Sequence, residues 1–322
     1  MKSIAVVGAN PALQKILRFE TLTIDEVNRA TAMQLTTGGK GTNFCRASRH
    51  HGRAAAVLFT FLGGSNGTRV GQLLEEEGLP FRAVRVSAET RECTTCLLAR
   101  SDAMTELIGP SHPIPPAAAA EMLAGITAAL EPAGGIDGLA IMGSLPDGTD
   151  PDLYTEWTRA ALAAGRPVLL DAVKGVEPAL RLPGSRHAIL KVNMEEFRKL
   201  TAPAADLAGA FHHAMREWTV EVVAVTNGPG LAYLQVRGEP LRVFRVPKLT
   251  NVVNPIGSGD TAAAVFFAEY LNGVGVVEAF RRGLVAASAN CLQIDAGVFD
   301  QADYDRLFDS VTVAEASEPL QA

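Results

Sequence analysis

The sequence predicts an α/β fold in which a mainly parallel central sheet lies between helices and a smaller sheet is inserted into it. Near-continuous apolar runs within 54–63 and 220–228 are typical of parallel strands that are covered on both faces. From residue 115 onward, helical segments alternate with short apolar strands, as in successive β–α units. Alternating, half-polar runs within 12–37 and 80–109 instead favour a small sheet with one open face.

The order of the expected elements favours a single domain over 1–322, with a small sheet formed by about 12–37 and 88–109 inserted into it. Strands are expected at 1–8, 13–20, 29–37, 54–63, 81–86, 92–101, 103–109, 136–143, 167–173, 187–193, 220–228, 231–238 and 239–247. Helices are expected at 41–52, 66–78, 115–130, 150–165, 194–201, 204–217, 259–272 and 275–292.

Composition and charge exclude several classes of function. The 322 residues carry 29 Lys+Arg and 35 Asp+Glu, so the formal net charge is −6 and gives no nucleic-acid footprint. A hydrophobic fraction of 48% supports a buried core, and no apolar stretch approaches the roughly 18 residues of a membrane helix. The apolar opening into Gly8 is typical of a first strand rather than a signal peptide, so we expect a cytoplasmic protein without membrane or nucleic-acid partners.

The four cysteines do not indicate a disulfide scaffold. Cys93 and Cys96 form a CxxC pair, which would suit a redox site or half of a zinc site. The surrounding segment alternates like a strand, however, and residues three apart in a strand face opposite sides. Two ordinary strand cysteines are therefore the favoured interpretation.

The segment NVVNPIGSGDTAA at 251–263 is the strongest candidate for chemistry. Gly257, Ser258 and Gly259 place successive backbone N–H groups at the start of an apolar helix, where the helix dipole favours an anion. Asp260 follows in the first turn, where a carboxylate beside a bound phosphoryl group can take a proton from an attacking hydroxyl. An Asp that merely caps the helix explains the same pattern, so the segment alone leaves both interpretations open.

A second segment, TTGGKGTNFCRAS at 36–48, turns from a strand into a helix through three glycines. The glycines allow close approach of the backbone to a ligand, Lys40 offers a cation for a phosphate, and Asn43 offers a donor and an acceptor for hydroxyls. The spacing of a P-loop is absent. An ordinary glycine-rich turn also explains the segment.

Two more turns follow expected strands. Asn193 and Glu196 are three apart at a helix start, a spacing that suits the water shell of a metal ion near phosphates. Thr226 and Gly228 leave a strand at a glycine-rich bend. A plain helix start and a hairpin turn are the alternative interpretations.

In this order along the chain, the GGKG-x-N, N-x-x-E, glycine-rich bend and GSGD segments resemble the ribokinase/PfkB carbohydrate kinase family. The resemblance covers nearly the whole chain, including the inserted sheet. NPAL at 10–13, VNRA at 27–30, ETR at 89–91, GSLP at 143–146 and NPIGSGD at 254–260 further resemble its phosphohexose kinase branch, which contains 1-phosphofructokinases, tagatose-6-phosphate kinases and the smaller 6-phosphofructokinases. The resemblance implies a ribokinase-like three-layer sandwich with a small inserted β-sheet lid.

The resemblance also implies roles for single residues. Asp260 would be the general base, and the N–H groups of Gly257, Ser258 and Gly259 would stabilise the transferring phosphoryl group. ATP and Mg²⁺ are the implied cofactors, and Asn193 and Glu196 would organise the metal mostly through water. Nucleotide binding is expected from Lys191, Asn193, Thr226, Gly228, Gly230 and Asn290. Sugar-phosphate binding is expected from Gln14, Arg29, Gly39, Lys40, Gly41, Asn43, Arg91 and Ser144.

Two positions depart from the family pattern. Gln14 stands in NPALQ where the family usually has an Asp that accepts from two sugar hydroxyls, and an amide has only one acceptor oxygen. In DAVKG, at 171–175, Lys174 stands where the branch commonly has a small Ser-Gly pair. An extra phosphate contact near ATP and an exposed side chain are the two interpretations, and we favour the exposed side chain.

We therefore expect an ATP-dependent kinase for a ketohexose phosphate of the fructose 1-phosphate or tagatose 6-phosphate type, working as a homodimer paired through the lid. A kinase for an unphosphorylated sugar or a nucleoside is one alternative, which the cations Arg29, Lys40 and Arg91 disfavour. A sugar-phosphate-binding relative without catalysis is the other. Asp260 argues against it, whereas Gln14 keeps it open.

Overall fold

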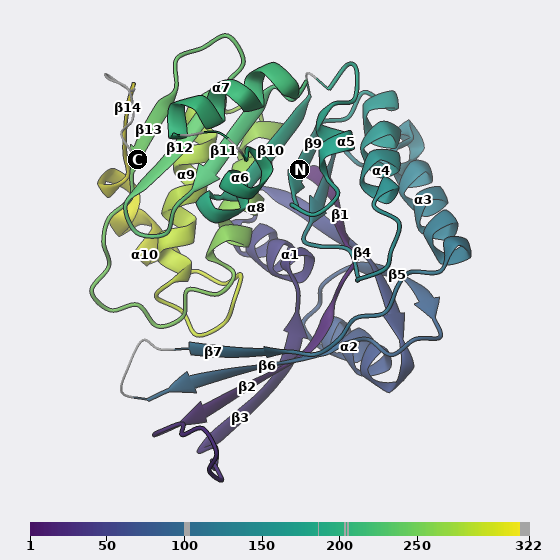
Figure 1. Ribbon diagram of the computed structural model, residues 1–322, viewed down its shortest axis with the longest axis vertical. Coiled ribbons are helices and arrows are strands. Elements are labelled where there is room, and N and C mark those ends of the chain that lie inside the picture. The colour runs from purple at the N-terminus through teal and green to yellow at the C-terminus, as the bar shows by residue number, and fades with distance from the viewer. Residues whose placement is uncertain (100–103, 186, 203, 205, 316–322) are drawn as a thin grey trace.

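A ten-stranded sheet forms the centre of the computed structural model, which describes residues 1–99, 104–185, 187–202, 204 and 206–315 (Figure 1). Its order is β14 (Thr312–Glu315), β13 (Arg242–Arg245), β12 (Leu231–Val236), β11 (Val222–Thr226), β10 (Ala188–Asn193), β9 (Val168–Asp171), β8 (Gly138–Met142), β1 (Lys2–Gly8), β4 (Ala54–Gly63) and β5 (Phe81–Val86). Neighbours from β5 to β11 pair in parallel, and β12 to β14 add antiparallel strands.

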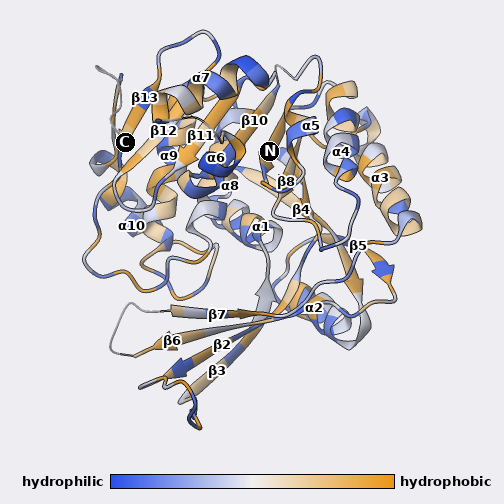
Figure 2. Ribbon diagram, viewed as in Figure 1, coloured by the Kyte–Doolittle hydropathy of each residue, from blue (hydrophilic) through white to orange (hydrophobic). Residues whose placement is uncertain are grey.

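Helices cover both faces of this sheet, so the expected three-layer sandwich is confirmed. One apolar core includes residues of α1 (Lys40–His51), α2 (Gly64–Glu76), α8 (Ser258–Leu271), α9 (Val276–Asn290) and α10 (Gln301–Leu307). The other includes residues of α3 (Pro116–Leu130), α4 (Asp152–Ala163), α5 (Glu177–Leu180), α6 (Met194–Leu200) and α7 (Leu207–Glu217). Successive side chains of a strand point to opposite faces of the sheet, so one strand contributes to both cores. In β1, Ile4 and Val6 belong to the first core, and Ala5 and Val7 belong to the second. Figure 2 shows the apolar residues gathered along these central strands.

A separate four-stranded sheet projects from the main body and is called the lid sheet here (Figure 1). Its order is β3 (Ala32–Gly38), β2 (Ala12–Phe19), β6 (Glu92–Leu98) and β7 (Met104–Ile108). Gln14 of β2 lies opposite Thr36 of β3 and Cys93 of β6, so these residues share one face. Cys96 lies on the other face, and all four cysteines are free, as the strand interpretation predicts.

The structure departs from the expected elements in several places. The short helix α5 was not expected, and the strand expected at 239–247 is limited to β13. Helix α10 and strand β14 were not expected; β14 is a short exposed edge strand without the apolar run that marks the inner strands. Strand β3 begins at Ala32 rather than at 29, because 21–31 form an exposed loop in which an Asn28 side chain binds the backbone of Thr23. The expected strand 92–101 ends at Leu98, and 100–103 lie outside the described residues. None of the described helices is long and apolar enough to cross a membrane.

Candidate active site

A cavity of about 740 Å³ lies between the lid sheet and the end of the main sheet. Its walls come from strands β2, β3 and β6 of the lid sheet, the first turns of α1, Asp260 of α8 and the loop around 295–298. Among the residues expected to bind sugar phosphate, those that line it are Gln14, Gly39, Lys40, Gly41, Asn43, Arg91 and Ser144. Residues that the sequence placed far apart therefore meet at one site.

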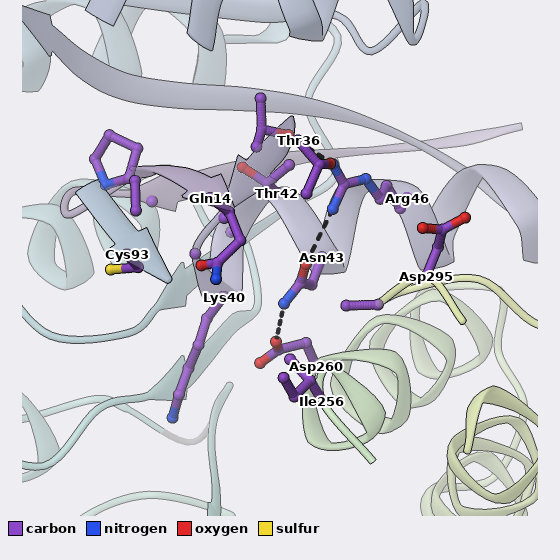
Figure 3. A pocket seen from close by; sticks show the side chains of 18 of the residues that line it. Gln14, Thr36, Lys40, Thr42, Asn43, Arg46, Cys93, Ile256, Asp260 and Asp295 are labelled. Carbon is purple, nitrogen blue, oxygen red and sulfur yellow. Dashed lines mark hydrogen bonds between the residues drawn. The ribbon is translucent and has the colours of Figure 1, made fainter. Parts of the chain in front are cut away.

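Asp260 lies at the floor of this cavity, in the first turn of α8. Gly257 precedes the helix with a φ of 79°, the left-handed conformation that glycine adopts most easily. A Cβ there would also lie 2.8 Å from the side chain of Ala296, so the close approach of that loop requires glycine. The turn leaves Asp260 only 6% exposed, and the amide nitrogen of Asn43 donates a 2.8 Å hydrogen bond to its Oδ2 (Figure 3).

The surroundings of Asp260 set its proton affinity. Burial raises its pKa from the usual 3.8 to about 6. The ammonium of Lys40 opposes this rise, as do the hydrogen bond from Asn43 and the charge of Lys191, whereas Asp171 adds to it. A carboxylate with a pKa near 6 is a better proton acceptor than an ordinary Asp and is still mostly ionised at neutral pH.

The N-terminus of α1 brings two predicted residues to the cavity. Strand β3 turns directly into α1 at Gly39, whose φ of 115° is unfavourable for other residues. A Cβ on Gly41 would lie 2.8 Å from the Cα of Gly8, so the first turn packs tightly against the end of β1. Lys40 and Asn43 project from this turn, Asn43 toward Asp260 and Lys40 away from Gln14 (Figure 3).

Lys40 belongs to a charge cluster around the buried side chains of Asp171 and Lys191. Its Nζ lies 2.6 Å from Asp171 Oδ1 and 3.1 Å from Glu196 Oε1, and Lys191 Nζ lies 2.9 Å from Asp171 Oδ2. Burial alone would raise the pKa of Asp171, but Lys191 and Lys40 hold it below its usual value. Lys191 also reaches the start of α8, with Nζ 3.1 Å from where a Cβ of Gly259 would lie. The cluster therefore places two ammonium groups beside the helix start that the sequence analysis proposed as an anion site.

Asp171 was missed by the sequence analysis as a member of the site. It ends the apolar strand β9 and is 1% exposed. An Asp at the carboxyl end of a buried parallel strand lies where ligands of such sheets bind, and that position was the available signal. Lys174 of the same segment is exposed, as predicted, and pairs with Asp147 at the surface.

The lid sheet contributes Gln14 to the cavity. Its Nε2 donates a 2.9 Å hydrogen bond to the hydroxyl of Thr95, which the sequence did not single out. Its Oε1 lies 2.8 Å from where a Cβ of Gly38 would stand, so the glycine gives room for this orientation. The amide therefore has its nitrogen engaged within the lid sheet.

The three other predicted sugar-phosphate ligands differ in position. Arg91 lines the cavity, donates from Nη2 to the backbone oxygen of Asn10 at 3.0 Å, and has a buried Nε without a partner among the described residues. Ser144 lines the cavity and is exposed. Arg29 is exposed in the loop before β3 and is not part of the cavity wall.

The residues expected to bind nucleotide lie around the ends of β10 and β11. Asn193 and Glu196 form a reciprocal capping box at the start of α6: each side chain accepts from the backbone N–H of the other. Thr226 ends β11, beside Asn193 in the sheet register, and the bend at Gly228 and Gly230 has positive φ and open space around it.

Asn290 is the predicted nucleotide residue that the structure places inside the protein. It is fully buried at the end of α9, and its Nδ2 donates to the backbone oxygens of Asp295 and Val298. It therefore holds the loop 291–298, which packs against α1 and α8 at the site.

Several solved structures share the fold of this chain. The chain is similar to a protein from Thermotoga maritima described as a possible 1-phosphofructokinase, with a TM-score of 0.85, 19% identity and coverage of 98% of this chain and 100% of that one. It is similar to phosphofructokinase-2 from Escherichia coli in complex with potassium (TM-score 0.83, 20% identity, coverage 96% and 99%) and to ribokinase from Arabidopsis thaliana complexed with ribose and ATP (0.70, 20%, 96% and 99%). These likenesses establish the ribokinase-like fold.

A family model confirms the resemblance that the motifs suggested. The model described as pfkB family carbohydrate kinase matches residues 1–301, which include the lid sheet, the cavity and the GSGD turn. The chain belongs to the pfkB family of carbohydrate kinases.

Proposed function

We propose that this protein transfers the γ-phosphoryl group of ATP to a hydroxyl of a ketohexose phosphate, of the fructose 1-phosphate or tagatose 6-phosphate type. The observation that carries the proposal is the position of Asp260: a buried carboxylate with a pKa of about 6, at a helix start, beside Lys40 and Lys191. A base next to an anion site is what phosphoryl transfer to a hydroxyl requires.

The reaction follows from the roles of these groups. The oxygen of the acceptor hydroxyl bonds to the γ-phosphorus of ATP while Asp260 accepts the proton of that hydroxyl. The bond between the γ-phosphorus and the bridging oxygen breaks, and ADP leaves with that oxygen. The N–H groups of Gly257 and Gly259 and the dipole of α8 stabilise the negative charge of the transferring group. The N–H of Ser258, which the resemblance also implied, donates to the backbone oxygen of Pro255 at 3.3 Å and would have to leave it to bind the phosphoryl group. Lys40 and Lys191 add positive charge on the same side.

The acceptor phosphate is assigned to Arg91. Among the other cations of the cavity, Lys40 is paired with Asp171 and Arg46 with Glu77. Arg49 is exposed and donates to the backbone oxygen of Glu77. Arg91 is half-buried and has no carboxylate partner in the described part of the chain. A guanidinium suits bidentate binding of a phosphate, and the buried Nε of Arg91 has a free proton to offer. Lys40 is then better placed for the transferring phosphoryl group than for the acceptor phosphate.

Mg²⁺ fits the donors at the nucleotide side. Asn193 and Glu196 carry oxygen atoms, which this hard cation prefers. These oxygens already accept hydrogen bonds in the capping box, and Glu196 also pairs with Lys40, so the two residues would hold Mg²⁺ through its water shell. No group of three or more His, Cys, Asp and Glu side chains suited to a metal occurs in the described ranges. In this proposal the phosphates of the nucleotide are further ligands. Bound Mg²⁺ would neutralise charge on the ATP phosphates.

The test is release of ADP with Mg-ATP and a panel of ketohexose phosphates, free ketohexoses and nucleosides. We expect turnover with a ketohexose phosphate, and Asp260→Asn should abolish it while calorimetric binding of the same acceptor persists. Turnover confined to free sugars or nucleosides would contradict the assigned acceptor class.

A second candidate function, a sugar-phosphate-binding protein without catalysis, is favoured by one observation. The amide of Gln14 replaces the carboxylate of the family pattern and is held by Thr95. This candidate predicts calorimetric binding of a ketohexose phosphate by the wild type and no ADP release across the whole panel.

A further inference from the structure

Arg46 is a buried arginine that lies in the wall of the cavity and that the proposed reaction does not use. It lies one turn after Asn43 on α1 and is 6% exposed. Its Nε and Nη2 bind the two carboxylate oxygens of Glu77 at 2.6 and 2.7 Å. Nη2 also donates to the hydroxyls of Thr36 and Thr37 at 2.9 and 2.6 Å. The guanidinium is thereby fixed by the end of α2 and by strand β3 of the lid sheet.

The remaining nitrogen of Arg46 contacts Asn43. Its Nη1 donates to Asn43 Oδ1 at 3.3 Å, and Asn43 Nδ2 donates to Asp260 Oδ2 at 2.8 Å, so the amide lies between the two charged groups (Figure 3). A guanidinium can only donate and an ionised carboxylate can only accept. These two neighbours therefore fix which end of the Asn43 amide faces Asp260.

We infer that Arg46 is a positioning residue for Asp260, acting through Asn43 and anchored by Glu77 and strand β3. The inference rests on the proposed kinase function, because it gives Asp260 its role as base. Without Arg46, the Asn43 amide loses the donor that holds its oxygen and can rotate, and Asp260 loses a fixed hydrogen bond. The anchoring hydroxyls belong to the lid sheet, so the position of that sheet and the state of the base are linked through one side chain.

The charges around Asp260 define what the test must hold constant. Lys40 of α1, Asp171 of β9 and Lys191 of β10 face it, and none of them contacts Arg46 in the described structure. Replacing Arg46 alone would change the local charge. The pair Arg46→Gln with Glu77→Gln removes one positive and one negative charge, so a change at Asp260 reports the Asn43 contact rather than net charge.

The experiment has two readouts. The first is the titration of the Asp260 carboxyl carbon by NMR in protein labelled at aspartate, assigned by comparison with Asp260→Asn. The second is the pH dependence of kcat/KM, whose acidic limb reports the base of the free enzyme. In R46Q/E77Q both midpoints should move upward by about one pH unit, because a hydrogen bond to the charged form is lost, and kcat/KM above the limb should fall roughly 10- to 100-fold. Arg46→Lys keeps the positive charge but lacks the several N–H donors of a guanidinium, so it should also move both midpoints upward.

The matched control is Arg281→Gln with Glu278→Gln on α9. That pair has the same arrangement, with Arg281 Nε and Nη2 on the two oxygens of Glu278 at 2.7 and 3.1 Å, and it lies outside the cavity. It should leave both midpoints unchanged.

The outcomes separate the two proposals. If the wild type turns over a ketohexose phosphate and the Asp260 midpoint is the same in wild type, R46Q/E77Q and R46K, the positioning role is wrong and the kinase function stands. If the midpoint shifts as expected but no acceptor is phosphorylated by the wild type, the positioning contact is supported and the kinase function fails. Should R46Q/E77Q not fold, R46K decides the question by the same two readouts.

Discussion

The ammonium nitrogen of Lys40 lies 2.6 Å from a carboxylate oxygen of Asp171 and belongs to the first turn of the helix that also carries Asn43. Burial alone would lower the pKa of Lys40, but Asp171, together with Asp260 and Glu196, raises it, so the ammonium remains charged throughout the physiological range. The pair joins the glycine-rich turn after β3 to the carboxyl end of β9. A permanent cation is thus fixed between the proposed acceptor and nucleotide sites.

Replacing this cation distinguishes its two possible roles. In Lys40→Met we expect kcat to fall roughly 100-fold or more, because a charge that stabilises the transferring group is lost, while KM for the sugar phosphate changes little. Steady-state kinetics with both substrates varied measure this. A KM for the sugar phosphate that rises tenfold at nearly unchanged kcat would instead show that Lys40 binds the acceptor phosphate.

Asp171 is predicted to be essential for stability as well as for activity. Asp171→Asn leaves Lys40 and Lys191 without their shared carboxylate, and breaking a buried ion pair costs about 3 kcal/mol or more. Because the pKa of Asp171 is lowered in the folded protein, its contribution is present at neutral pH and is lost as the pH falls below the ordinary range of aspartate.

Denaturant unfolding at pH 7.5 measures the effect of Asp171→Asn. Asp147→Asn is the matched control, because Asp147 pairs with Lys174 at the surface with both side chains more than 80% exposed, and we expect no measurable loss. Equal stability of D171N and D147N would contradict the buried cluster.

The parts of the fold with a strong local pattern were predictable from the sequence. The inner strands carry continuous apolar runs, and the glycines at 39 and 257 mark the two turns that begin α1 and α8. Helix α10 and strand β14 were not predictable in this way, because α10 is short and β14 is an exposed edge whose pairing depends on β13.

Site residues that belong to a sequence motif were predictable, whereas residues whose role depends on a tertiary contact were not. Asp260 and Asn43 lie in motifs, and the structure brings them within 2.8 Å. Thr95 contacts Gln14, which lies 81 residues away in the sequence. Arg46 contacts Asn43 on the neighbouring turn of α1. No spacing rule in the sequence indicates which of several arginines is buried between a helix and a lid strand.

The raised pKa of Asp260 predicts opposite pH effects on activity and stability. With a pKa of about 6, the base becomes protonated as the pH falls through 6, so kcat/KM should decline below that pH. For stability the sign is reversed: a carboxyl whose pKa is raised by folding makes the folded state less stable as the pH rises from about 4 to above 6.

Asp260→Asn tests both consequences. Near neutral pH it should be inactive yet more stable than the wild type by about 1–3 kcal/mol, and this gain should vanish near pH 4. Unfolding measured across this pH range provides the check. A D260N protein that is less stable at every pH would show that ionised Asp260 is favourable in the fold.

Gln14→Asp is expected to increase activity on a ketohexose phosphate. The Gln14 amide donates to Thr95 and keeps one acceptor oxygen, whereas a carboxylate offers two oxygens that accept stronger, charge-assisted hydrogen bonds from sugar hydroxyls. An increase in kcat/KM of roughly tenfold corresponds to about 1.4 kcal/mol, within the range for one such bond. Thr95→Val, which frees the amide nitrogen, should not reproduce the increase, and a decrease in Q14D would indicate an acceptor matched to glutamine.

The outer face of the lid sheet predicts the assembly state. In the register of the sheet, Met33 and Leu107 lie on the face opposite Gln14, and they are 66% and 58% exposed. Ile24 and Val27 in the adjoining loop are still more exposed. Burying such side chains against a second copy stabilises by about 1.5 kcal/mol or more for each one that becomes fully buried. We therefore expect a homodimer paired through the lid sheets, which would also bring the exposed Arg29 near a neighbouring subunit.

Charges placed on that face test the dimer. Met33→Glu and Leu107→Glu should each shift the sedimentation coefficient from dimer to monomer at micromolar concentration, because two like charges would be buried at a symmetric contact. Val313→Glu on the distant edge strand β14 is the control, since Val313 is also exposed, at 41%, and should leave the dimer intact. If kcat/KM for the sugar phosphate falls in the monomeric variants and Arg29→Ala lowers it in the intact dimer, Arg29 acts across the subunit contact. A wild type that sediments as a monomer at these concentrations would refute lid pairing and leave Arg29 as a solvated loop residue.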